Sequence, residues 1–156
     1  MCQPSPLQQA WDAYSKAAQS ILDEYDLAQN EMAKVDIALN PPIGGGGQKL
    51  DSMTPDGAIN SLEQRVVPHL SAAAAKAAAI QFPHRDHVPV LVAHHDELIA
   101  ALKEKRDAYL AIVDAYKHKD SGRFGAATRS LGEAGDKLAR YREWFYDAMD
   151  NGGPSE

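Results

Sequence analysis

The sequence predicts an all-α protein: a single domain of 156 residues, folded as an up-down-up-down four-helix bundle of long, heptad-patterned helices. Two runs of apolar residues, spaced alternately four and three apart, are the basis of this prediction. One run extends from Leu7 to Leu39 and the other from Phe124 to Ala148. Such spacing places the apolar side chains on one face of a helix that packs lengthwise against other helices. We expect a monomeric core without strands.

The first helix is expected over about 6–39. Ser5 is suited to cap its amino end and Pro6 to occupy the first helical position, where a missing N–H costs nothing. Asn40-Pro41-Pro42 ends it, because a proline disfavours helical geometry in the residue before it. Four consecutive glycines, Gly44–Gly47, then predict a mobile loop over 40–54. The apolar seam of this helix comprises Leu7, Trp11, Tyr14, Ala18, Ile21, Tyr25, Ala28, Met32, Val35 and Leu39.

Three more helices are expected over about 55–81, 87–118 and 121–150. Thr54-Pro55-Asp56 opens the second, since proline and an acid both suit a first turn. In the last helix, Gly132 and Gly135 each cost roughly 1 kcal/mol relative to alanine. Small residues permit close approach, so we expect this helix to lie near a neighbour there. The bundle topology gathers both termini, the link between the second and third helices, and most aromatic residues at one end.

The charge pattern excludes one class of partner. The net charge is −6, and the first sixty residues hold eight acids against three bases. Nucleic-acid binding requires a basic stripe that neutralises phosphates, and the sequence has none. No apolar run approaches the roughly 20 residues that cross a bilayer, so we expect no transmembrane helix.

The single cysteine, Cys2, permits no intrachain disulfide. It follows Met1 and precedes the polar run Gln3-Pro4-Ser5-Pro6, a start that resembles the mature amino terminus of a bacterial lipoprotein. The resemblance covers one residue and its context. It implies a lipid on Cys2, and a membrane-anchored, extracytoplasmic location in which small helical lipoproteins serve as immunity, exclusion or envelope-assembly factors. Without the lipid, a cytoplasmic location is expected.

Four histidines within twelve residues are the basis of the alternative prediction, a metal-binding or metal-sensing bundle. They are His84, His87, His94 and His95. Imidazole suits zinc, copper and nickel, and on a helix starting by Asp86 the side chains of His87 and His94 share one stripe. Asp86, Asp96 and Glu97 are the acids nearest to them. The pattern matches no known zinc signature, so surface histidines, with His95 on the apolar seam, are the competing interpretation.

The sequence favours a non-enzymatic binding or adaptor protein, with no cofactor. It contains no nucleophile elbow, phosphate loop or haem-attachment motif, and its inward seams are almost wholly aliphatic, alanine or aromatic. Asp23, Glu24 and Asp26 belong to an acidic face of the first helix that suits a basic protein partner. Trp144 and Tyr146 flank a seam residue and are expected to be exposed, where aromatic residues favour partner binding.

Overall fold

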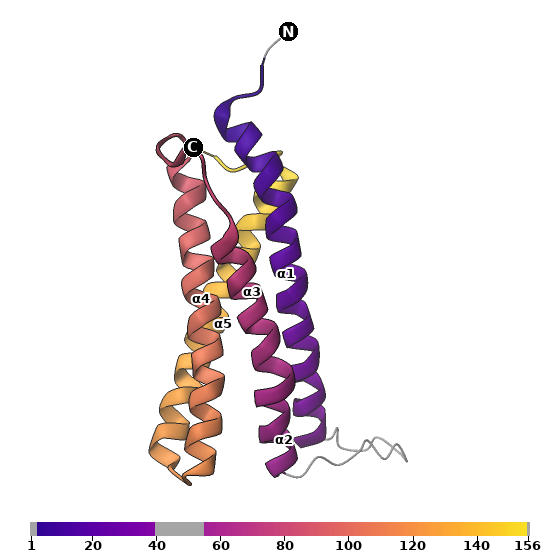
Figure 1. The fold of residues 1–156 in the computed structure, drawn as a ribbon, viewed down its shortest axis with the longest axis vertical. Helices are drawn as coiled ribbons and strands as arrows, with labels where there is room; N and C mark the ends of the chain where they lie inside the picture. The colour runs from indigo at the N-terminus through magenta and orange to yellow at the C-terminus, as the bar shows by residue number, and fades with distance from the viewer. Residues whose placement is uncertain (1–2, 40–54, 156) are drawn as a thin grey trace.

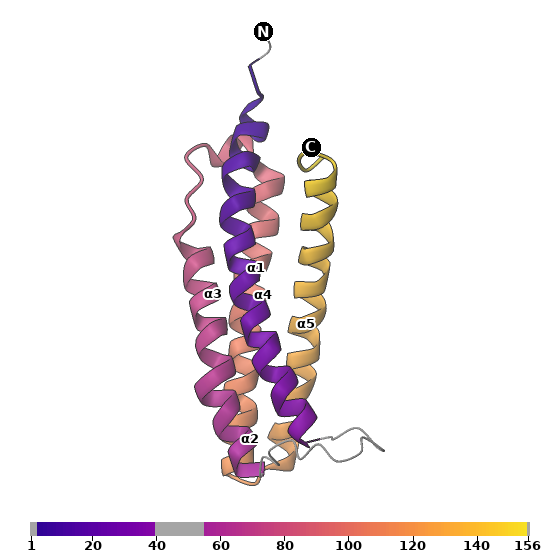
Figure 2. The same ribbon diagram turned by 90° about the vertical axis from the view of Figure 1, so that its right-hand side faces the viewer.

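The computed structural model describes residues 3–39 and 55–155, and every regular element in this part of the chain is a helix. Four long helical segments run side by side, with the first and last described residues at the same end of the molecule (Figures 1 and 2). The all-α class is therefore confirmed. Cys2 and the loop predicted over 40–54 lie outside the described residues.

The first helix, α1, spans Pro6–Leu39. Ser5 caps it, because its Oγ accepts a hydrogen bond from the backbone N–H of Gln8 at 3.1 Å. Most of the predicted seam is buried, while Leu7 and Met32 are half-buried. The buried residues of this seam are Trp11, Tyr14, Ala18, Ile21, Tyr25, Ala28 and Val35.

The second predicted helix is interrupted. It consists of α2 (Pro55–Ser61), a π-helical turn η1 (Leu62–Val66) and α3 (Val67–Ala79). Pro68 explains the interruption, because it has no N–H for the carbonyl four residues earlier and its ring would clash with that carbonyl. The chain widens instead, so that the N–H of Val67 donates to the carbonyl oxygen of Leu62, five residues back.

Segment 80–88 joins α3 to α4 and contains one short 3₁₀ turn, η2 (Arg85–His87). α3 ends at Ala79 rather than at residue 81, because Ile80 takes an extended conformation with ψ 127°. α4 spans Pro89–Lys117, where a helix was expected over about 87–118. A proline at the first position of α4 fixes that start.

The last helix, α5, spans Ser121–Asp150 and is capped by Asp120, whose carboxylate accepts from the N–H of Arg123 at 3.0 Å. Two expectations for this helix are wrong. Phe124, predicted on the seam, is 42% exposed. Within the described part of the chain, a Cβ added to Gly132 or Gly135 would meet no atom within 4 Å, so these glycines do not face a closely packed helix.

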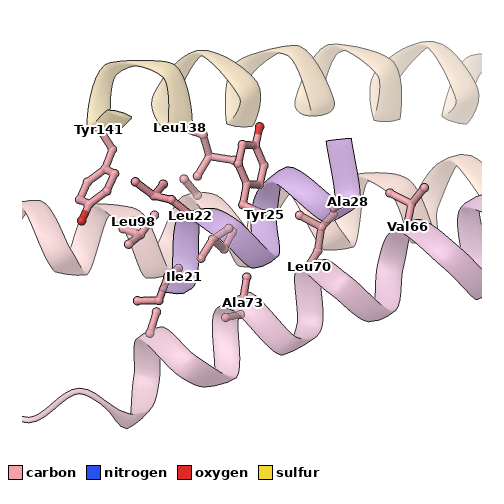
Figure 3. Packing of buried hydrophobic residues seen from close by; sticks show 14 of the residues in the cluster. Ile21, Leu22, Tyr25, Ala28, Val66, Leu70, Ala73, Leu98, Leu138 and Tyr141 are labelled. Atoms are coloured by element: carbon pink, nitrogen blue, oxygen red, sulfur yellow. The ribbon is translucent and has the colours of Figure 1, made fainter. Parts of the chain in front are cut away.

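The core lies along the axis between the helices. Leu70 and Ala73 of α3 point toward α1, whereas the ring of Tyr25 of α1 points away from α3 and lies beside Leu138 of α5 (Figure 3). Ile21, Leu22 and Leu98 belong to the same buried cluster. α5 packs mainly against α4, whereas α1 packs against α3. Long side chains, described below, make the contacts between α1 and α5.

Candidate functional site

A groove of about 720 Å³ lies between the first three turns of α1 and segment 80–88. Its volume falls within the range typical of ligand-binding clefts. Three alanines lie on the α1 wall, and the other wall combines apolar residues with one glutamine and two histidines. The lining residues are Pro6, Gln9, Ala10, Ala13, Tyr14, Ala17, Ile80, Gln81, Phe82, Pro83, His84, His87 and Val88.

Segment 80–88 is held along α1 by two inward side chains. The ring of Phe82 lies 5.8 Å from that of Tyr14 and 5.3 Å from that of His95, measured between centroids. Val88 is buried as the chain enters α4. Pro83 favours an extended conformation at Phe82, so the segment runs as a wall rather than as another helical turn.

A buried hydrogen-bond chain beneath the groove joins all four long helical segments. Tyr14 Oη of α1 lies 2.6 Å from Tyr141 Oη of α5 and 3.0 Å from His95 Nδ1 of α4. On its other side, His95 Nε2 lies 2.7 Å from the carbonyl oxygen of Ala77 in α3. Tyr14 also lines the groove, so these hydrogen bonds hold one residue of the groove wall in place.

The chemistry of these groups determines which atom donates and which accepts in each bond of this hydrogen-bond chain. A carbonyl oxygen only accepts, so His95 Nε2 carries the proton that binds Ala77 and Nδ1 is left as an acceptor. Tyr14 therefore donates to Nδ1, and Tyr141 donates to Tyr14. Burial lowers the pKa of His95, which keeps the ring neutral, and burial raises the pKa of both Tyr14 and Tyr141.

The structure does not bring the four candidate metal ligands together. His84 and His87 are exposed at the groove, with ring centroids 5.9 Å apart. His94 stacks on Trp144 at 3.9 Å, and both nitrogens of His95 are engaged in the chain above. Across residues 3–39 and 55–155, no three His, Cys, Asp or Glu side chains are placed to hold a metal ion. The expected stripe of His87 and His94 does not form, because His87 precedes α4.

Of the three acids predicted to bind a partner, only Asp23 is both exposed and without a cation beside it among the described residues. It accepts a hydrogen bond from Gln19 at 3.0 Å. Glu24 is half-buried and lies 3.4 Å from His69 and 4.0 Å from Lys76.

The third acid, Asp26, pairs with Arg142 of α5. Glu24 and Asp26 therefore join helices of this chain to one another. Asp23 alone keeps the role of a free surface acid.

Of the two aromatic residues predicted to be exposed, Trp144 and Tyr146, only one is exposed. Trp144 is half-buried, because its ring contacts Trp11 at 6.0 Å and stacks on His94. Tyr146 is 42% exposed, as expected. Trp144 thus helps to join α5 to α1, and Tyr146 remains a surface residue.

Lys105 is a buried residue that the sequence reasoning missed. It is 5% exposed, and its Nζ donates to Tyr25 Oη at 2.7 Å and to Gln29 Oε1 at 2.9 Å. Burial, helped by the nearby Arg142 guanidinium, lowers the pKa of Lys105 to about 8. The signal was its spacing, since residue 105 is three after Leu102 and four before Tyr109 on the seam of α4.

No known protein-family model, curated protein or solved structure matches this chain. None of the described helices is long and apolar enough to cross a membrane.

Proposed function

We propose that this chain is a non-enzymatic binding protein and that the groove between α1 and segment 80–88 is its binding site. The observation that carries the proposal is an apolar groove whose most deeply placed polar atom is already satisfied. Tyr14 Oη donates to His95 and accepts from Tyr141. An apolar occupant can therefore cover Tyr14 without leaving a buried polar group unpaired.

An apolar helical segment of a partner protein fits the α1 wall. Ala10, Ala13 and Ala17 lie three and four residues apart, so they share one face of the helix. From Pro6 to Ala17 this face is about 16 Å long, which corresponds to roughly three turns of a partner helix. Amphipathic helices bind other proteins in this way, with their apolar side chains in a groove.

Binding agrees better than catalysis with the groups on this groove. Its polar side chains besides Tyr14 are two glutamines and the exposed pair His84 and His87. A catalytic site requires a nucleophile or base held by a second group within hydrogen-bonding distance. His95, the buried histidine beneath the groove, has both ring nitrogens committed to structural hydrogen bonds.

We extend the proposal to topology and location. The helices form an up-down-up-down bundle with heptad packing, and a lipid on Cys2 anchors the protein outside the cytoplasm. Pro6, which lines the groove, is four residues from Cys2 in the sequence. The partner would then be an envelope protein that meets the groove close to the membrane, as suits an immunity, exclusion or envelope-assembly factor.

The test compares binding by two variants of equal charge. Ala13→Glu places a charged side chain on the groove wall, and Ala126→Glu places one on exposed α5 away from it. In affinity capture from the native source, we expect Ala13→Glu to lose a partner that wild type and Ala126→Glu both retain. Equal recovery by both variants would exclude the groove. A third variant, Asp23→Lys, tests whether the surface acid speeds encounter with a basic partner.

A further inference from the structure

Among the described residues, the middle of the junction between α1, α4 and α5 holds two cations, Lys105 and Arg142, and one carboxylate, Asp26. Lys105 of α4 is buried, and both of its hydrogen-bond acceptors, Tyr25 Oη and Gln29 Oε1, are neutral. No carboxylate in the described part of the chain is paired with its Nζ. The charge of Lys105 therefore has no counter-charge in direct contact.

Arg142 of α5 is the second cation. Its guanidinium pairs with Asp26 of α1, which neutralises one positive charge. Its Nε is buried and donates to no acceptor among the described residues. An orphaned buried N–H is uncommon in folded proteins, because it loses its hydrogen bond to water and gains nothing in return.

Both cations lie against the same aromatic ring. Lys105 Nζ is 4.8 Å from the centroid of the Tyr25 ring, and Arg142 Cζ is 5.4 Å from it. The Lys105 ammonium, whose acceptors are both uncharged, and the Arg142 guanidinium, whose Nε has no described acceptor, thus both lie close to the Tyr25 ring. Together, Lys105, Arg142 and Asp26 carry a net charge of about +1 at neutral pH, since Lys105 then still holds its proton.

We propose that a small monovalent inorganic anion, of the size of chloride, binds beside Tyr25 between Lys105 and Arg142. It accepts a hydrogen bond from the third N–H of the Lys105 ammonium and one from Arg142 Nε. One negative charge balances the cluster, whereas a phosphate dianion would bring excess charge and a larger cost of dehydration. Gln29 is exposed, so the site has an edge through which an ion can enter.

The environment of Lys105 supports this assignment. Its pKa falls to about 8 because burial and Arg142 both disfavour the ammonium form. An anion beside it favours that form, so binding of the anion and of the proton must strengthen each other by the same factor. This reciprocity makes the proposal measurable on the intact chain, independently of the groove and its partner.

The experiment compares sodium chloride with sodium gluconate at equal ionic strength and pH 7. We expect the urea midpoint of wild type to rise with chloride concentration and not with gluconate. Lys105→Met should abolish the difference, whereas Lys103→Met, at an exposed lysine two residues away, should retain it. A chloride effect that survives in Lys105→Met would place the ion elsewhere and overturn the proposal.

A second measurement does not depend on the folding of a variant. The titration of Lys105 in wild type, followed by NMR of its side chain, should shift upward in chloride relative to gluconate. The shift is about one pH unit if chloride binds the ammonium form tenfold more tightly than the neutral amine and saturates it. An identical titration in both salts would show that no anion binds beside Lys105.

Discussion

The direction of the hydrogen-bond chain beneath the groove predicts that two similar substitutions have unequal effects. Tyr14→Phe removes the hydroxyl that donates to His95 Nδ1 and accepts from Tyr141. It leaves two buried groups without partners: an acceptor on His95 and a donor on Tyr141. Tyr141→Phe removes only the donor at the start of the chain, so Tyr14 still donates to His95.

The magnitudes follow from the number of groups left unpaired. Each buried unsatisfied group costs about 1–3 kcal/mol, so the two groups left by Tyr14→Phe should lower the free energy of unfolding by roughly 2–6 kcal/mol. Tyr141→Phe loses the net value of one hydrogen bond and leaves no orphaned donor, which predicts about 1 kcal/mol. Tyr146→Phe, at an exposed tyrosine, should stay within about 0.5 kcal/mol of wild type and serves as the control.

Urea denaturation followed by circular dichroism measures all three variants, provided that the slope of unfolding free energy against denaturant is unchanged. The double variant Tyr14→Phe/Tyr141→Phe should be less destabilised than the two single effects predict in sum, because it removes the stranded donor of Tyr141. If Tyr141→Phe costs as much as Tyr14→Phe, the chain does not run from Tyr141 through Tyr14 to His95, and the assigned tautomer of His95 is wrong.

Three further outcomes are expected. Gly132→Ala and Gly135→Ala should each raise the free energy of unfolding by about 0.5–1 kcal/mol, because a methyl group there meets no described atom within 4 Å. A loss of stability in urea denaturation would show that the helix is packed at those positions. Gly153→Ala is the contrasting variant and should destabilise the protein, since Gly153 has φ +149°. Stability should fall as the pH drops below 6.5, the ordinary pKa of histidine, since burial lowers the pKa of His95 in the folded protein and the unfolded chain binds the proton first. Thermal melts of His95→Gln should lack this pH-dependent loss of stability. An equal slope of melting temperature against pH in that variant would assign the loss to another group. In chloride-free buffer, stability should rise between the folded Lys105 pKa of about 8 and the ordinary lysine value of 10.5, because folded Lys105 has released its proton while the unfolded lysine has not. Lys105→Met should remove the rise and be more stable than wild type by up to about 3 kcal/mol at pH 7. A destabilised Lys105→Met would mean that the ammonium is fully compensated.

Local chemistry in the sequence accounts for how the helices begin and end. Ser5 and Pro6 together specify the start of α1, and both act as expected. The π turn at Leu62–Val66 was missed although its cause, Pro68, was visible. A proline inside an apolar pattern indicates an irregularity, but whether the helix kinks, breaks or widens depends on the neighbours against which it packs.

The site was harder to predict, because it depends on which helices face each other at each level. The sequence placed His95 on the seam but assigned Glu24 and Asp26 to solvent. In the structure, Asp26 pairs with Arg142 and Glu24 lies beside His69, pairings that require the register of α1 against α5 and α3. Periodicity gives the inward face of each helix, not its neighbour across the bundle.

Tyr14 connects the proposed binding site to the rest of the fold. It lines the groove, and its hydroxyl joins α1 to α4 and α5, while His95 continues the connection to α3. Since four helices must keep their relative positions to maintain these bonds, the groove wall is held in one arrangement before any partner arrives. A preformed site avoids part of the entropic cost of ordering on binding. Tyr14→Phe should therefore weaken binding at the groove by loosening its wall, although the hydroxyl itself makes no bond to an apolar occupant.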